Sequence, residues 1–212
     1  MKVLFVFSAA PASSIEGAAW LKSLDMLKAR GIEPHVVLPE TGDGTLAEAL
    51  KQRKVKIYVR YFTSWATEAS DASSSMAKAF RFATGRANKT SEKDIRAIIK
   101  EQDIKLVYVS EGTINAGVVA AAKEKVPVLW QFNQLIGAEG SSLAFIDTDA
   151  KVAQSLALAT ALLASNEEIA ADLRGRCPRS DVRVIDPADK DAGDELFAVM
   201  RSTMAKANGV AL

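Results

Sequence analysis

The sequence has little of what most metal, disulfide and redox sites are built from. Its 212 residues include one cysteine, Cys177, and one histidine, His35. A single cysteine excludes a disulfide within the chain, and a single histidine excludes a metal site of the ordinary histidine-rich kind. We therefore expect no cofactor and no metal ion, and the low cysteine content is typical of a reducing compartment, so we expect a cytoplasmic protein.

Long apolar runs and a surplus of one charge are also lacking. No stretch approaches the roughly 20 apolar residues that a membrane-spanning helix needs, so we expect no transmembrane segment. The 27 Lys and Arg residues nearly balance the 26 Asp and Glu residues, giving a formal net charge of +1. Such a chain has no general attraction to nucleic acid, and we expect no nucleic-acid partner. The start of the chain, with its apolar stretch at 3–12, could pass for a short signal peptide, but we interpret it as a buried first strand at 3–7 because serines and Glu16 follow at once.

What the sequence does have is two stretches with the order strand, loop, helix, strand, at residues 1–39 and 106–135. Each is a βαβ unit, and such units stack side by side into parallel sheets. The predicted fold class is therefore α/β: a three-layer Rossmann-like open sheet, mostly parallel, with helices on both faces. The expected strands are 3–7, 34–38, 56–59, 106–109, 128–132, 161–164 and 182–185. The expected helices are 15–29, 46–52, 113–125, 152–159, 167–174 and 195–206.

Other parts of the chain give weaker signals. We expect residues 1–190 to form one Rossmann-like domain, and residues 191–212 to form a C-terminal helix and tail. The segment 64–89 is interpreted as helical, and 141–150 as a loop. Ser91 and Asp94 are predicted to form a capping box that starts a new helix. Ser165 is predicted to cap the helix that begins at Glu167.

Candidate binding residues cluster where predicted strands end. The first loop supplies Ser13, Ser14 and Gly17, beside the start of a helix. Amides and hydroxyls there suit an anion, although the loop contains neither GxxxxGK[ST] nor GxGxxG. The alternative is an ordinary turn with Ser14 as the helix cap. Glu111 and Gly112 follow a later strand: they suit a hydroxyl-bearing ligand, or they form a solvated loop end.

Three amides form the second part of this predicted site. Gln131 and Asn133 alternate with Trp130 and Phe132, so they share one face of the strand end, and Gln134 follows. Amides donate and accept hydrogen bonds at once, which suits sugar hydroxyls. The alternative is a buried amide network or an exposed strand end.

Several further residues favour structural interpretations. His35 lies within an apolar strand and Cys177 has no histidine near it in sequence, so we interpret both as packed residues. A basic and aromatic group suits either phosphates or a lipid surface, but a solvated helix face is the better interpretation. Its members are Lys78, Phe80, Arg81, Phe82, Arg86 and Lys89.

The order of these pieces resembles the N-terminal domain of family 4 of the retaining glycosyltransferases, which have two Rossmann-like halves (the GT-B fold). The resemblance covers roughly residues 1–190, and each string alone is a weak motif. The segments that carry it are KVLFV at 2–6, EGAA at 16–19, the segment 24–39 (which ends in RGIEPHVVLP at 30–39), GDGTLAEALK at 42–51, KIYV at 56–59, PVLWQFNQL at 127–135, ASNEEIAADL at 164–173 and VRVI at 182–185.

The resemblance implies an acceptor-binding domain. In such enzymes the N-terminal half holds the carbohydrate acceptor and the C-terminal half grips the sugar nucleotide. The expected function is therefore a glycosyltransferase-like acceptor domain that lacks the donor half, and acts with a separate donor-binding chain or persists as a remnant. If it is active, the reaction is hexosyl transfer.

The departures from the family leave the catalytic residues unassigned. The family strand carries histidines and an acid where this chain has Gln131, Asn133 and Gln134, and amides cannot replace an acid or base. Ala19 and Trp20 stand where an acid often follows the first-loop glycines. A non-catalytic scaffold that binds carbohydrate or protein is therefore the alternative function. A nucleotide-binding enzyme is a third hypothesis with less support, because Glu40 is the only acidic residue at a position suited to bind a ribose.

Overall fold

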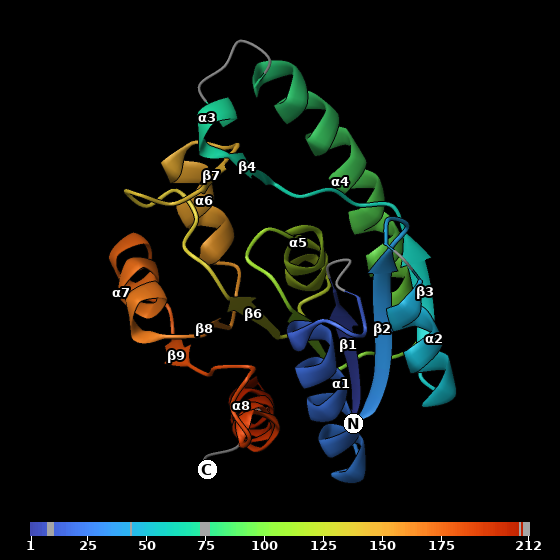
Figure 1. Cartoon of the computed structure of the whole chain (residues 1–212). Coiled ribbons are helices and arrows are strands. Elements are labelled where there is room, and N and C mark those ends of the chain that lie inside the picture. Colours follow the sequence, from blue (N-terminus) through green and yellow to red (C-terminus); the bar gives the residue numbers. More distant parts are fainter. Residues whose placement is uncertain (8–10, 43, 73–76, 208, 210–212) are drawn as a thin grey trace.

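The computed structural model of the chain describes residues 1–7, 11–42, 44–72, 77–207 and 209, and it contains one large parallel sheet (Figure 1). The strands run in the order β3-β2-β1-β5-β6-β8-β9, and every neighbouring pair is parallel. Their bounds are β1 Lys2–Val6, β2 Glu33–Pro39, β3 Lys56–Arg60, β5 Leu106–Val109, β6 Val128–Phe132, β8 Ala161–Ala164 and β9 Val182–Val184. β4 (Ala66–Glu68) and β7 (Leu143–Phe145) form a separate antiparallel pair.

Helices cover both faces of the sheet, so the predicted three-layer α/β fold is confirmed. One face packs against α1 (Ile15–Ala29), α2 (Thr45–Gln52) and α8 (Ala192–Ala207). The other packs against α4 (Ala77–Glu101), α5 (Ala116–Lys123), α6 (Asp149–Leu156) and α7 (Glu167–Arg176). The short α3 (Ala69–Ala72) follows β4. No helix in the described part of the chain has both the length and the apolar character to cross a membrane.

The central strands form because their side chains are apolar on both sides. In β1, Val3 and Phe5 point into the core beneath α1 and α2, while Leu4 and Val6 point into the core beneath α4 and α5. Successive residues of a strand face opposite ways, so a strand covered on both faces needs a continuous apolar run. β5 and β8 are likewise fully buried, as their sequences LVYV and ALLA predict.

The strand order reverses at β1. The chain leaves β1 toward β2 on one side, and β5 pairs with β1 on the other side. The loops after β1 and β5 therefore diverge and leave a crevice between them, which is where open α/β sheets bind ligands. This switch point positions the site described below.

The predicted helix start at Ser91 is wrong, because α4 is one continuous helix of 25 residues. The Ser91 hydroxyl donates to the carbonyl of Ala87, four residues back at 3.0 Å, and also to the carbonyl of Tyr61. A serine inside a helix can bond backward in this way, so its hydroxyl need not cap a new helix.

Two smaller predictions are also corrected. Asn166, not Ser165, caps α7, since its side chain accepts a hydrogen bond from the Ile169 amide at 3.0 Å. The segment 141–150 is not wholly a loop, because it contains β7 and the start of α6. β7 pairs with β4, some 75 residues earlier, which local sequence cannot indicate.

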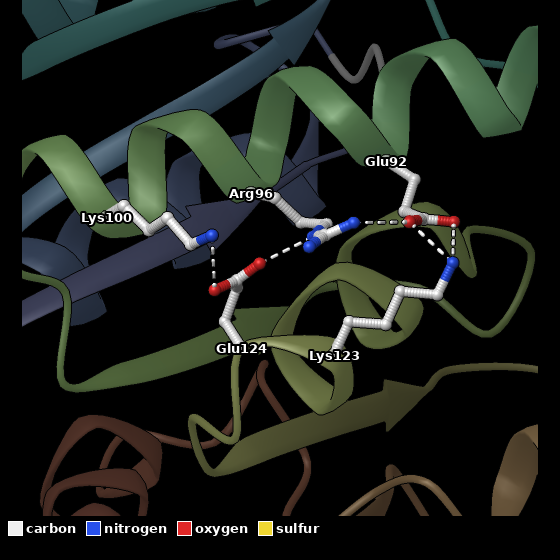
Figure 2. A network of polar contacts seen from close by, with 5 residues as sticks. All are labelled: Glu92, Arg96, Lys100, Lys123 and Glu124. Atoms are coloured by element: carbon white, nitrogen blue, oxygen red, sulfur yellow. Dashed lines mark hydrogen bonds and ion pairs between the residues drawn. The ribbon is translucent and has the colours of Figure 1, made fainter.

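Five charged side chains tie α4 to α5 (Figure 2). Glu92 accepts from Lys123 at 2.7 Å, and Glu124 accepts from Arg96 at 2.5 Å and pairs with Lys100 at 3.2 Å. The Arg96 guanidinium lowers the pKa of Glu124, so this carboxylate stays ionised. The network fixes the C-terminal part of α4 against the helix that follows the switch point.

The C-terminal helix α8 folds back onto α1. Arg30 pairs with Asp194, and its guanidinium lies 5.1 Å from the ring centroid of Phe197. Gly193 packs against Met26, where a Cβ atom would lie 2.9 Å from the sulfur. α8 therefore shares the core of the sheet face on which α1 lies.

Candidate functional site

A small pocket lies at the switch point, where β1, β5 and β6 end and α1 begins. We call it the switch-point pocket. The residues that line it are Phe7, Glu16, Gly17, Trp20, Leu46, Tyr108, Ser110, Asn133 and Pro187. The space open to the centres of water-sized groups is about 20 Å³. One water needs roughly 10–15 Å³ on this measure, so the pocket accepts one or two small groups and not a whole sugar ring.

The start of α1 forms one wall. The Ser14 hydroxyl accepts a hydrogen bond from the Gly17 amide at 2.9 Å and donates one to the Pro11 carbonyl at 2.8 Å. A Cβ atom on Gly17 would lie 2.2 Å from that same carbonyl oxygen, so only glycine fits there. Ser14 is thus the helix cap, the structural alternative noted in the sequence, and Gly17 allows α1 to begin close to the Pro11 turn and place Glu16 at the pocket mouth.

Two buried polar atoms in the pocket lack a partner among the described residues. They are the Ser110 hydroxyl oxygen and the Asn133 side-chain oxygen. The Asn133 amide nitrogen donates to the Ser110 carbonyl at 3.2 Å and lies 3.5 Å from a carboxylate oxygen of Glu16. Leaving a buried polar group unsatisfied costs about 1–3 kcal/mol. Such a cost is tolerated where the group serves a ligand, so these atoms make the pocket a candidate binding site.

Glu16 is the carboxyl group of the pocket, and its pKa is shifted. Partial burial raises its pKa, the negative charge of Glu111 raises it further, and the hydrogen bond from Asn133 partly offsets both. Perturbed carboxyls in clefts are candidates for binding or proton transfer. Glu16 can therefore accept a hydrogen bond from a ligand, and it holds a proton up to a higher pH than an ordinary glutamate.

An aromatic wall closes the pocket on the sheet side. Phe7 and Trp20 meet edge to face, and the Tyr108 ring packs at 5.7 Å from Phe5. Complete burial raises the pKa of Tyr108, so its hydroxyl remains neutral. The aromatic part of the lining is therefore uncharged.

The loop at Glu111 and Gly112 lies beside the pocket and is held by two indoles. Trp130 donates to the Glu111 carbonyl at 2.9 Å, and Trp65 donates to the Gly112 carbonyl at 2.6 Å. The Glu111 carboxylate accepts from the Thr113 hydroxyl at 2.9 Å. The space beside Gly112 is filled by Phe132, since a Cβ atom would lie 2.2 Å from its ring. Gly112 thus serves packing, and Glu111 acts on Glu16 through its charge.

The remaining predicted residues lie elsewhere. Gln131 is 1% exposed, and its amide donates to the Ile185 carbonyl at 3.3 Å, which is the buried-amide alternative noted in the sequence. Gln134 and Ser13 are exposed. The structure therefore brings Gly17 and Asn133 together in the pocket. Glu16 and Ser110 also line the pocket and were not among the predicted site residues; Ser110 directly follows a buried strand, but that position alone does not indicate a site.

Other sequence features have structural explanations. His35 is buried, and its ring nitrogens lie 3.2 Å from the Tyr58 hydroxyl and 3.2 Å from Glu33. Cys177 is buried beside Ser180. In the basic and aromatic group, the Arg86 guanidinium lies 5.7 Å from the exposed Phe82 ring. The side chains of 78, 80 and 81, and residues 8–10 of the first loop, lie outside the described residues.

Comparisons with known proteins find no matching family model and no matching curated protein. Solved structures do match. The UDP-GlcNAc 2-epimerase from Neisseria meningitidis, bound to UDP-GlcNAc, has a TM-score of 0.56 and 18% identity over 97% of this chain and 52% of its own. MnaA from S. aureus with UDP has a TM-score of 0.56 and 18% identity, over 91% of this chain and 46% of that one. A glycosyltransferase from Rickettsia africae has a TM-score of 0.56 and 14% identity, over 87% of this chain and 42% of its own.

The chain has a Rossmann-like fold of the GT-B type. It spans about half the length of these solved proteins. At such low identities the likeness establishes the fold and not an activity. The predicted GT-B relationship is thereby confirmed at the level of fold, whereas membership of glycosyltransferase family 4 and the place of the chain as an N-terminal half stay predictions.

Replacing Glu16 with glutamine is expected to raise the free energy of unfolding at pH 7.5 by less than about 1 kcal/mol, because solvent at the mouth screens the charge. In the native state, partial burial and the charge of Glu111 raise the pKa of Glu16 above its ordinary value. The native protein therefore binds the proton of Glu16 more tightly than the unfolded chain does. The resulting contribution to the free energy of unfolding is present at low pH and is lost as the pH rises through the raised pKa. Urea unfolding of Glu16→Gln and wild type at pH 4 and pH 7.5 measures the difference.

The increase in the free energy of unfolding that Glu16→Gln brings should be larger at pH 7.5, where Glu16 is charged, than at pH 4. Glu139→Gln, at an exposed glutamate away from the pocket, is the matched control and should change the free energy of unfolding less than Glu16→Gln does. An equal or smaller gain at pH 7.5 for Glu16→Gln would show that the pocket does not disfavour the carboxylate.

Proposed function

We propose that this chain is a carbohydrate-binding half of a GT-B-type glycosyltransferase, and that its acceptor binds at the switch-point pocket. The observation that carries the proposal is the pair of unpartnered buried atoms, on Ser110 and Asn133, at the point where the strand order reverses. A ligand that bonds both atoms recovers the cost of burying them. Sugar hydroxyls are suited to this, because each one donates and accepts.

The comparisons support a role in sugar chemistry. Two of the similar solved structures hold UDP or UDP-GlcNAc, and a third is a glycosyltransferase. The resemblance to family 4 adds that the half in question is the acceptor side. In this proposal a second Rossmann-like domain, in the same or a separate polypeptide, grips the sugar nucleotide, and transfer requires both halves.

The roles of the residues follow from their positions. Asn133 and Ser110 bond a hydroxyl of the acceptor that enters the pocket, and Glu16 accepts a hydrogen bond at the mouth. The carbon that carries this hydroxyl lies toward Trp20 and Phe7. The strand-end amides bind without transferring protons, so the titratable group on this side is Glu16.

A non-catalytic scaffold on the same fold is the second candidate. The observation that favours it is the burial of Gln131, which bonds Ile185 and is thereby withdrawn from any ligand. A transferase assay with several nucleotide sugars, with and without cell extract, separates the two. Hexosyl transfer that appears only with extract supports an acceptor half with a partner, and stable glycan binding without any transfer supports the scaffold.

Binding itself is tested by isothermal titration calorimetry of the full chain against methyl glycosides and nucleotide sugars. Asn133→Ala is expected to weaken glycoside binding about tenfold, because the hydroxyl of the glycoside loses its hydrogen bond to the Asn133 side-chain oxygen. Gln134→Ala, at the exposed neighbour, is the control and should bind as wild type does. Absence of binding to every glycoside, or equal losses in both variants, would refute the proposal.

A further inference from the structure

The charge of the switch-point pocket has one sign. Its described lining includes Glu16 and no lysine, arginine or histidine, and Glu111 adds a second negative charge close enough to raise the pKa of Glu16. A phosphate group at this place would meet two carboxyls and no compensating cation. The field of the pocket therefore opposes an anion.

The hydrogen-bonding groups of the pocket are mainly acceptors. The free atom of Asn133 is its oxygen, since its nitrogen already donates to the Ser110 carbonyl. The Glu16 carboxylate also accepts, while the Ser110 hydroxyl does either. The ionised phosphates of a nucleotide sugar have no proton to donate, whereas a hydroxyl donates one. The complementary ligand group is thus a hydrogen-bond donor.

The start of α1 does not reverse this preference, although helix N-termini generally favour anions. The Gly17 amide is already bonded by the Ser14 hydroxyl, and the Ala12 amide by the Thr45 hydroxyl at 2.9 Å. Glu16 itself places a carboxylate in the first turn. The negative charge of Glu16 therefore already offsets the positive end of the helix dipole.

The size of the pocket leads to the same conclusion. About 20 Å³ of space for water-sized centres admits a hydroxyl or hydroxymethyl group and not a phosphate with its four oxygens. The aromatic wall of Trp20, Phe7 and Tyr108 fits the carbon that carries such a hydroxyl. Charge, hydrogen-bonding groups and volume thus select the same kind of ligand group.

We infer that the switch-point pocket binds an uncharged hydroxyl group of a carbohydrate and excludes phosphate. This inference rests on the proposed function and sharpens it: the group inserted at Ser110 and Asn133 belongs to a neutral sugar. Any phosphate of a nucleotide sugar lies outside the pocket.

The test is a titration of the ¹⁵N-labelled full chain followed by NMR, with methyl glycosides, inorganic phosphate and UDP as separate probes. We expect the side-chain amide of Asn133 and the backbone amide of Gly17 to shift with a methyl glycoside and to stay unchanged with phosphate. Shifts of these two signals with phosphate, or with UDP more strongly than with the glycosides, would overturn the inference while leaving nucleotide binding by the chain intact.

The failures of the two proposals are distinguishable. Glycoside-induced shifts confined to other residues would refute the pocket assignment, but carbohydrate binding would stand. No shift with any probe would refute the proposed function and the inference with it.

Ser110→Ala provides a readout that a structural serine would not give. The hydroxyl has no partner among the described residues, so its removal should leave the urea midpoint unchanged or higher. Affinity for the glycoside should nevertheless fall about threefold to tenfold, the loss of one neutral hydrogen bond. Ser13→Ala, in the exposed turn before α1, is the control and should alter neither value. A lower midpoint with unchanged affinity would assign Ser110 to the fold instead.

Discussion

Replacing Gly112 with alanine is expected to destabilise the protein by about 2–3 kcal/mol, because the added methyl group has no space. Its carbon would lie 2.2 Å and 2.4 Å from two ring atoms of Phe132 and 3.1 Å from Ile136. Both neighbours are buried and cannot swing into solvent. The alternative movement, of the loop itself, would break the bond from Trp65 to the Gly112 carbonyl. Urea denaturation monitored by tryptophan fluorescence measures the change.

Gly85→Ala is the matched control. Gly85 lies inside α4, is exposed, and has no atom within 4 Å of the position that a Cβ would take. Alanine is favoured over glycine within a helix, so this substitution should stabilise the protein by about 0.5–1 kcal/mol. Similar small effects in both variants would show that the Glu111–Gly112 loop is not packed against Phe132 as described.

Trp130→Ala is expected to cost about 3–5 kcal/mol, the usual range for removing a large aromatic side chain from a core. Trp130 is fully buried, its ring centroid lies 5.5 Å from that of Trp65, and its nitrogen donates to the Glu111 carbonyl. The loss therefore combines a cavity with an unsatisfied carbonyl next to the site. Thermal and urea unfolding measure it.

Trp130→Phe separates these two contributions. It keeps most of the ring volume and removes the donor, so a smaller cost of about 1–2 kcal/mol is expected. Glycoside affinity should fall in this variant as well, because the Glu111 loop that flanks the pocket loses one of its two indole anchors. A Trp130→Ala variant as stable as wild type would contradict the assigned core.

The parallel sheet was predictable because its strands are buried on both faces, and this leaves continuous apolar runs such as LVYV and ALLA. The single long α4 was not predictable from local sequence, because a serine with a following acid looks the same at a cap and inside a helix. Ser91 is distinguished only by its bond to Tyr61, 30 residues away. The pairing of β4 with β7 depends on contacts of the same long-range kind.

The candidate site was predictable at Asn133 and only in part elsewhere. Gln131 and Asn133 lie two residues apart along one strand end, as the alternation predicts. The connection after β9 places the Ile185 carbonyl over Gln131, whereas Asn133 reaches the crevice beside Ser110. Glu16 and Ser110 become site residues only because the ends of α1, β5 and β6 meet. That meeting is a property of the sheet order, and no single segment encodes it.

A crystal structure of the chain with the tightest-binding methyl glycoside is the most direct test of the account. We predict a sugar hydroxyl within hydrogen-bonding distance of the Ser110 hydroxyl and the Asn133 side-chain oxygen, with the ring outside the pocket beside Glu16. The larger groove of about 610 Å³, beside Asp149 and Arg176, should remain empty. A glycoside seated in that groove, with nothing bound at Ser110 and Asn133, would contradict the claim that the switch point is the binding site.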